Sequence, residues 1–209
     1  MTTPAAFPTD EVMAVFAKDP IITNLIQNGL PLKSSRSEDL YLKLVGSIVS
    51  QQLSTKVAAV IFRRFTELFP ETYPHPHLVL EASDETLRSA GLSFQKMGYI
   101  RNVAAFAAEG NMAHAVIDAM EDEALIQHLT QIKGVGRWTV EMLLMFALER
   151  PDVFPVDDLG IQNAMKKHYG FDLKGKELKL KMQSIAESWR PYRTIASKYL
   201  WQSLDNAPA

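Results

Sequence analysis

The stretch LTQIKGVGRWTV, residues 129–140, decides the fold of this chain. Gly134 and Gly136 flank a single apolar residue, which lets the chain turn tightly and expose backbone N–H groups where a second helix begins. Apolar residues on both sides of the turn recur at helical spacing. The stretch therefore predicts two helices joined by a tight turn that can hold a phosphate, although a lone turn of this kind is more often a packing corner.

An acidic pair follows one apolar helix later, in FPVDDLGIQNAMKKH, residues 154–168. Asp157 and Asp158 come 19 and 20 residues after Trp138 and stand where a helix is predicted to begin. A carboxylate is favoured there by the positive end of the helix dipole. The acidic pair indicates either a buried anion close to the phosphate-binding turn or two residues that only cap a helix.

Composition narrows the class of protein. The 209 residues are 47% apolar and 22% charged, which is enough to bury a substantial core in one domain or two small ones. Zero cysteines exclude disulfides, thiolate zinc sites and cysteine-ligated clusters, and the histidines show no ligand spacing beyond His75 and His77. The sequence shows no apolar membrane-spanning run and no leader, so we expect a cytoplasmic protein that does not enter a membrane.

Charge is unevenly distributed along the chain. The net charge is −2, yet residues 164–198 carry nine Lys and Arg against three acids, whereas residues 118–123 carry four acids and no base. A basic face of this kind can meet nucleic-acid phosphates while the total stays near neutral. Taken alone, the run of lysines is more simply explained as the solvated side of helices.

Helical periodicity dominates the sequence, and the alternation typical of strands is nearly absent. Ser35 to Glu38 fits a capping box ahead of a helix that includes Leu40 to Leu53. We expect an all-α chain, in two lobes with a DNA-binding cleft between them. Further helices are predicted over residues 11–18, 21–29, 56–69, 84–90, 95–109, 113–120, 123–130, 137–148, 158–169, 176–187 and 192–204.

Two further stretches belong with these motifs: LVGSIVSQQLSTKVA, residues 44–58, and WRPYRTIASKYLW, residues 189–201. With all four stretches in this order, the chain resembles the helix-hairpin-helix DNA glycosylase superfamily. Within it, the chain is similar to the 3-methyladenine DNA glycosylase II (AlkA-like) family. The resemblance implies one catalytic unit over residues 1–209, with the helix-hairpin-helix at about residues 123–148. It also implies a monofunctional enzyme that hydrolyses the N-glycosidic bond of alkylated purines, of the 3-methyladenine and 7-methylguanine type, in base-excision repair.

The resemblance assigns the catalytic carboxylate to Asp158, with Asp157 as the fallback. Breaking an N-glycosidic bond builds positive charge on the sugar, which a nearby carboxylate stabilises. Bifunctional relatives place a nucleophilic Lys directly after the turn, where this chain has Trp138, so no strand cleavage is expected. The base pocket is expected to use Trp138, Met142 and Trp201, since aromatic faces stack on a cationic base, although Trp and Met at helical spacing are more often core.

The same resemblance places DNA contacts at the hairpin and at two loops. Hairpin positions Gly134, Val135, Gly136 and Arg137 would grip the sugar-phosphate backbone. Phe94 would insert into the duplex, and Gln52 would lie near the vacated space or the opposite strand. No cofactor is required, but backbone carbonyls of Thr130, Ile132 and Val135 could hold a structural Na⁺ or K⁺.

The expected partner is double-stranded DNA that contains alkylated bases, bound by a monomer. Two alternatives stay open. The chain could be a non-catalytic helix-hairpin-helix DNA-binding module, or a glycosylase for another damaged or mismatched base. The acidic pair with the aromatic residues argues against the first alternative. Trp138 and the lack of cysteines argue against an oxidised base as substrate.

Overall fold

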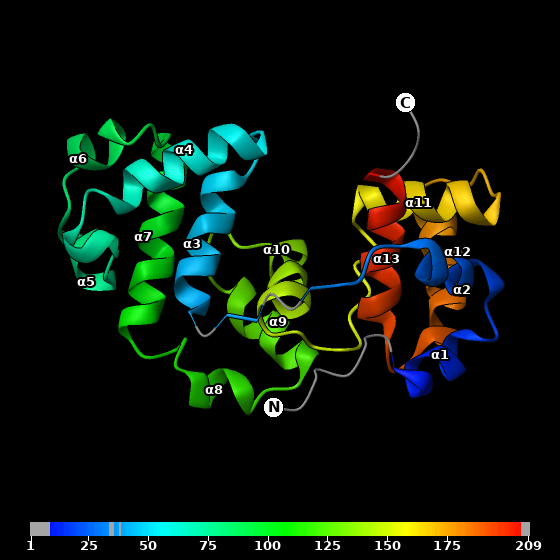
Figure 1. Cartoon of the computed structure of the whole chain (residues 1–209). Coiled ribbons are helices and arrows are strands. Elements are labelled where there is room, and N and C mark those ends of the chain that lie inside the picture. Colours follow the sequence, from blue (N-terminus) through cyan, green and yellow to red (C-terminus); the bar gives the residue numbers. More distant parts are fainter. Residues whose placement is uncertain (1–8, 34–35, 38, 206–209) are drawn as a thin grey trace, which may run out of the picture. The chain divides into compact units, whose positions relative to one another are not determined.

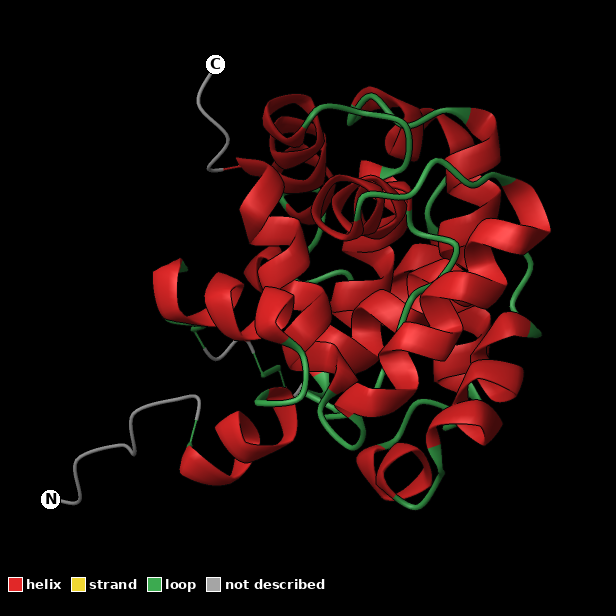
Figure 2. Cartoon of the chain, turned by 90° about the vertical axis from the view of Figure 1, so that its right-hand side faces the viewer, coloured by secondary structure: helices red, strands yellow, loops and turns green. Residues whose placement is uncertain are grey.

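The computed structural model describes residues 9–33, 36–37 and 39–205. Within these ranges every regular element is a helix and no strand occurs, as Figure 2 shows by colour. The expectation of an all-helical chain is therefore confirmed. None of the helices in the described ranges has the length and apolarity that crossing a membrane requires.

The chain divides into two compact units, which agrees with the prediction of two lobes. Residues 36–143 form one unit, drawn from cyan to yellow-green in Figure 1. The amino-terminal helices and the chain from Leu144 onward form the other unit. The second unit is thus built from both ends of the sequence, and its two parts depend on each other for a core.

The unit of residues 36–143 is organised around one long helix, α7, which packs on α3, α5 and α6. The buried side of α3 carries Leu44 and Ile48, one turn apart, which explains why this segment is helical and why this face is covered. The helices of the unit are α3 (Leu40–Ser50), α4 (Thr55–Thr66), α5 (Pro76–Glu81), α6 (Asp84–Ser89), α7 (Phe94–Ala108), α8 (His114–Asp118), α9 (Asp122–Thr130) and α10 (Arg137–Met142), with a short 3₁₀ turn over Pro70–Thr72.

The other unit packs α13 against α2 and α11. Its core includes a buried polar centre at Asp19, which caps α2 through the amides of Ile21 and Ile22. The same carboxylate accepts hydrogen bonds from the Tyr169 hydroxyl at 2.6 Å and the Trp189 indole at 2.9 Å. The helices are α1 (Asp10–Phe16), α2 (Pro20–Asn28), α11 (Leu159–Tyr169), α12 (Gly175–Ala186) and α13 (Arg193–Asp205), with a 3₁₀ turn over Glu187–Trp189.

Most predicted helices lie within three residues of their observed bounds, and three details differ. Helix α5 was not predicted, because prolines around its start read as a breaker, whereas Pro76 occupies the first helical position that proline tolerates. Helix α10 ends at Met142 and continues as a π-helical segment, Leu143–Ala147, instead of staying α-helical to residue 148. Helix α3 begins at Leu40 with Asp39 as its cap, while Ser35 and Glu38 of the predicted capping box lie outside the described residues.

Candidate functional site

Asp158 is a buried carboxylate held from two directions. It caps α11, and its Oδ1 accepts the backbone N–H of Ile161 at 2.8 Å. The indole Nε1–H of Trp201, on α13, donates to the same oxygen at 2.6 Å. Only 7% of the residue is exposed. Hydrogen bonds from N–H groups to an ionised acceptor are short and directional, so the carboxylate is fixed in position.

Gly160 makes this contact sterically feasible. A Cβ at position 160 would lie 2.7 Å from Nε1 of Trp201 and 3.0 Å from Oδ1 of Asp158. Any side chain there would occupy the space through which the indole reaches the carboxylate. The sequence DLG at residues 158–160 therefore provides both the acceptor and the gap beside it.

Asp157 lies in a different environment from its neighbour. Its Oδ1 forms an ion pair with Lys179 Nζ at 2.5 Å, and 48% of its side chain is exposed. An exposed ion pair contributes little to stability and leaves the carboxylate in contact with water. Of the two predicted acids, only Asp158 is buried and oriented by neighbouring N–H groups.

The Trp201 ring also forms one wall of a hollow. Phe146 stacks on it with ring centroids 5.5 Å apart and an interplanar angle of 11°. The hollow has a volume of about 380 Å³, within the range of ligand pockets. It is lined by Pro31, Leu32, Lys33, Phe146, Lys198, Trp201 and Gln202. Only Trp201 among these was predicted, although Lys198 is one helical turn before it, a spacing that signals a shared face.

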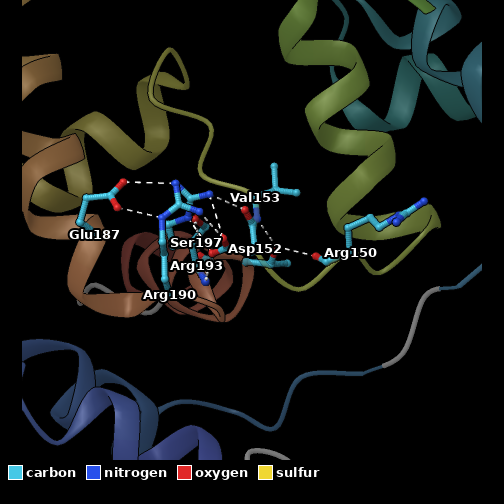
Figure 3. Close-up of polar contacts among 8 residues, drawn as sticks. Arg150, Asp152, Val153, Glu187, Arg190, Arg193 and Ser197 are labelled. Carbon is cyan, nitrogen blue, oxygen red and sulfur yellow. Dashed lines mark hydrogen bonds and ion pairs between the residues drawn. The ribbon is translucent and has the colours of Figure 1, made fainter. Parts of the chain in front are cut away.

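A salt-bridge cluster anchors the segment that leads to Asp158. The Asp152 carboxylate accepts hydrogen bonds from Arg193 Nε at 2.7 Å and from Arg190 Nη1 at 2.5 Å (Figure 3). The Thr194 hydroxyl donates to the Arg150 carbonyl at 2.6 Å and accepts the Val153 N–H at 2.9 Å. Residues 150–153 are thereby tied to the first turn of α13, the helix that carries Trp201.

The predicted helix-hairpin-helix consists of α9 and α10, which pack on each other (Figure 1). Gly134 has a φ of +104°, and a Cβ there would lie 2.2 Å from Cγ of Tyr99, so only glycine fits at this position. Gly136 caps α10, and a Cβ there would meet nothing within 4 Å. Packing therefore requires a glycine at position 134, whereas at position 136 there is space for a side chain beside the start of α10.

Helix α7 supports the hairpin and the loop after α3 together. Asn102 Nδ2 donates to the Lys133 carbonyl at 3.0 Å. Lys96 Nζ donates to the carbonyls of Val49 at 2.7 Å and Gln51 at 2.8 Å, closing the end of α3. The Gln51 side chain in turn donates to the Gly134 carbonyl at 3.4 Å. Burial lowers the pKa of Lys96 below its ordinary value.

Two predicted DNA-contact residues project from this supported region. Phe94 is the first residue of α7 and is 67% exposed, with the Arg88 guanidinium 4.6 Å from its ring centroid. Gln52 is exposed and has a φ of +58°, a left-handed conformation that residues other than glycine adopt infrequently. Such a conformation is often retained where a side chain must point in a defined direction.

The Arg137 side chain is held by acidic side chains of the two hairpin helices. Its guanidinium donates to both carboxylate oxygens of Glu123, at 3.0 and 2.7 Å, and to Glu141 at 3.0 Å. The hydrogen bond to Glu123 raises the pKa of Arg137, and the same bond lowers the pKa of Glu123. The side chain therefore joins α9 to α10, and the backbone of the turn is the part of the hairpin that can meet a phosphate.

The predicted residues thus fall into two groups. Gln52, Phe94, the hairpin, Thr130, Trp138 and Met142 belong to the unit of residues 36–143, while Asp157, Asp158 and Trp201 belong to the other unit. Trp138 is 43% exposed on the first turn of α10, and Met142 is half-buried one turn further along. Ile132 and Val135 are buried within the hairpin. The described side chains include no group of three or more His, Cys, Asp or Glu that could hold a metal ion.

The family model of the HhH-GPD superfamily base excision DNA repair proteins matches residues 45–191. The chain belongs to this superfamily.

Individual relatives agree with this membership. DNA-3-methyladenine glycosylase 1 of Schizosaccharomyces pombe is 35% identical over 184 residues, which cover 87% of this chain and 80% of that protein. YfjP of Bacillus subtilis is 36% identical over 183 residues, covering 85% of this chain but 62% of its own length. The structure of the S. pombe 3-methyladenine DNA glycosylase Mag1 in complex with abasic DNA superposes with a TM-score of 0.81 at 32% identity, covering 95% of this chain and 98% of that one.

Proposed function

We propose that this chain is a monofunctional DNA glycosylase that hydrolyses the N-glycosidic bond of alkylated purines in double-stranded DNA, as a step of base-excision repair. The observation that carries the proposal is the buried carboxylate of Asp158, fixed by the Trp201 indole in a chain of this superfamily. The relatives named as 3-methyladenine glycosylases support the choice of alkylated purines.

In this proposal, Asp158 stabilises the positive charge that develops on the sugar when the base departs, and it orients the attacking water. The two N–H groups that hold Oδ1 support this role, because a positioned carboxylate needs no reorganisation during the reaction. Asp157 is the weaker choice, since Lys179 neutralises it at the surface. An alkylated purine that already carries a positive charge leaves without a strong general acid.

The monofunctional part of the proposal rests on Trp138. A Lys at this position in bifunctional relatives would attack C1′ and cleave the strand through a Schiff base, and tryptophan has no nucleophilic nitrogen for that step. We assign Trp138 and Met142 to the wall of the base pocket together with Trp201. The exposed indole of Trp138 supports this assignment, because an exposed aromatic face is available for stacking.

The DNA contacts are proposed for the region supported by α7. The backbone of Gly134, Val135, Gly136 and Arg137 would bind the sugar-phosphate chain, and Phe94 would fill the gap left by the extruded base. The strong exposure of Phe94 supports insertion, since a residue that only packed against the core would be covered. The left-handed Gln52 supports a contact near the opposite strand or the vacated space.

A structural Na⁺ or K⁺ at the hairpin belongs to the same proposal. Its ligands would be the carbonyls of Thr130, Ile132 and Val135, neutral oxygens that suit such a cation. The Ile132 carbonyl accepts the Val135 amide at 3.0 Å and has a second lone pair available. The cation would bridge the turn to a DNA phosphate. We expect no cofactor, and the monomeric state and the cytoplasmic location stay predictions.

A direct test follows base release from methylated duplex DNA by wild type, Asp158→Asn and Asp157→Asn, with alkali added afterwards to reveal abasic sites. Wild type and Asp157→Asn should release methylated purines and leave strands that break only after alkali. Asp158→Asn should bind the DNA but lose release by at least about a hundredfold.

Each other outcome points to a different function. Strand breaks without alkali would contradict the monofunctional mechanism. Full release by Asp158→Asn would remove that residue from catalysis. DNA binding by wild type without release of any base would favour the alternative of a non-catalytic binding module, and release confined to another damaged or mismatched base would change the substrate class.

A further inference from the structure

Lys198 carries a positive charge into the hollow beside Trp201. It lies on α13, one turn before Trp201, and its Nζ is 5.0 Å from the centroid of the Phe146 ring. Phe146 is the ring that stacks on Trp201. The residue is half-buried, and burial lowers the pKa of its ammonium, an effect that Glu149 opposes. The cation therefore lies beside the aromatic wall of the hollow.

The side-chain amide of Gln202, another polar group of the hollow, already forms hydrogen bonds to the backbone. Gln202 Oε1 accepts the Leu30 N–H at 2.7 Å, and its Nε2 donates to the Leu30 carbonyl at 3.1 Å. Its amide is therefore directed at the backbone of the amino-terminal segment. Lys33, the second cation of the lining, is exposed. Among the lining residues, this leaves Lys198 as the half-buried hydrogen-bond donor that faces the stacked rings.

We propose that Lys198 is a specificity residue that makes this pocket prefer purines with an oxygen at position 6 over purines with an amino group there. The inference rests on the proposed function and names its substrate class. An ammonium has three donors and no acceptor. The O6 of 7-methylguanine or hypoxanthine can accept one of these donors, whereas the 6-amino group of 3-methyladenine presents another donor.

The position of Trp201 explains why a base stacked on it would lie near Lys198. Trp201 links the hollow to the proposed reaction centre, because it lines the hollow and its Nε1–H donates to Asp158. A purine bound in the hollow with its glycosidic bond at Asp158 would lie against residues of α13, among them Lys198. A site that hydrogen-bonds one substituent discriminates strongly against an analogue that leaves the site's polar group unpaired.

Dimethyl-sulfate-treated DNA tests the inference, because it contains 7-methylguanine and 3-methyladenine in the same molecules. Both nucleosides are cationic, and every variant acts on the same DNA, so a change in the ratio of their initial release rates between wild type and a Lys198 variant reports the contribution of Lys198. Lys198→Met should lower the ratio of 7-methylguanine to 3-methyladenine by about tenfold, the loss expected for one charge-assisted hydrogen bond. Lys198→Arg keeps the donors and should hold the ratio within about threefold. The control Lys43→Met, at an exposed position of α3 that does not line the hollow, should leave the ratio unchanged.

The possible outcomes distinguish a failure of this inference from a failure of the proposed function. A ratio unchanged in Lys198→Met, or equal losses for both bases as for a phosphate contact, would overturn the role of Lys198 while leaving the glycosylase activity intact. Release of neither base by wild type would instead contradict the proposed function. If Lys198→Met does not fold, as judged by its melting curve, Lys198→Leu removes the donors with a different apolar side chain and gives the same readout.

Discussion

Replacing Gly160 by alanine should uncouple Trp201 from Asp158. The added Cβ would lie 2.7 Å from the indole nitrogen, whereas ordinary van der Waals contact begins at 3.4 Å. The indole or the carboxylate must therefore shift by about 0.7 Å, which would stretch the hydrogen bond from 2.6 Å to about 3.3 Å, beyond the distance of a well-formed N–H···O bond. A hydrogen bond to a charged group is worth about 1.5–3 kcal/mol, so kcat for base release should fall by roughly 10- to 150-fold.

The assay is single-turnover release of 7-methylguanine, measured together with DNA affinity and the melting temperature. Gly98→Ala is the matched control, since Gly98 also lies within a helix and a Cβ there meets nothing within 4 Å. Alanine stabilises a helix relative to glycine by about 0.5–1 kcal/mol, so the control should melt no lower than wild type and should retain its activity.

Unchanged release in Gly160→Ala, with the protein folded, would refute the reasoning that the indole positions the carboxylate. A loss of release that merely tracks a lower melting temperature would assign the contact to stability alone. The expected pattern is a loss in kcat with DNA affinity kept within about threefold, because neither residue of the pair is proposed to bind the backbone.

Three further changes test other parts of the structure. Gly134→Ala should destabilise the protein by at least about 2 kcal/mol, because of its positive φ and the tyrosine ring packed over it, while Gly136→Ala should not, as thermal melts will show. Phe94→Ala should reduce base release by about tenfold without changing the melting temperature, with Leu80→Ala, another exposed apolar residue, as the control. Asp19→Asn should cost about 2–3 kcal/mol, seen as a melting temperature about 5–10 °C lower, since its carboxylate serves four donors.

The local elements were largely predictable from the sequence. Periodic apolar residues and the glycine turn located α9 and α10, because both signals act within one or two helical turns. The end of α10 was not predictable, since a π-helical segment is a local adjustment with no marker in residues 143–147. Helix α5 was missed because Pro76 is compatible with both a loop and a first helical turn.

The residues of the candidate site could be predicted from the sequence, but the contacts between them could not. The family resemblance pointed to Asp158 and Trp201, which are separated by 43 positions, but no sequence period indicates that the indole of one reaches the carboxylate of the other. The need for Gly160 follows only from that contact. The ion pair of Arg137 with Glu123, 14 positions away, was not predictable for a similar reason, because no sequence period links the two residues.

The anchoring of residues 150–153 to α13 has a consequence for local opening. Asp152 and Thr194 join the segment before Asp158 to the helix that carries Trp201, through hydrogen bonds that leave little backbone free to exchange. The two sides of the carboxylate–indole contact should therefore open as one cooperative unit. The amide protons of Val153 and Thr194 should therefore exchange with solvent at similar slow rates.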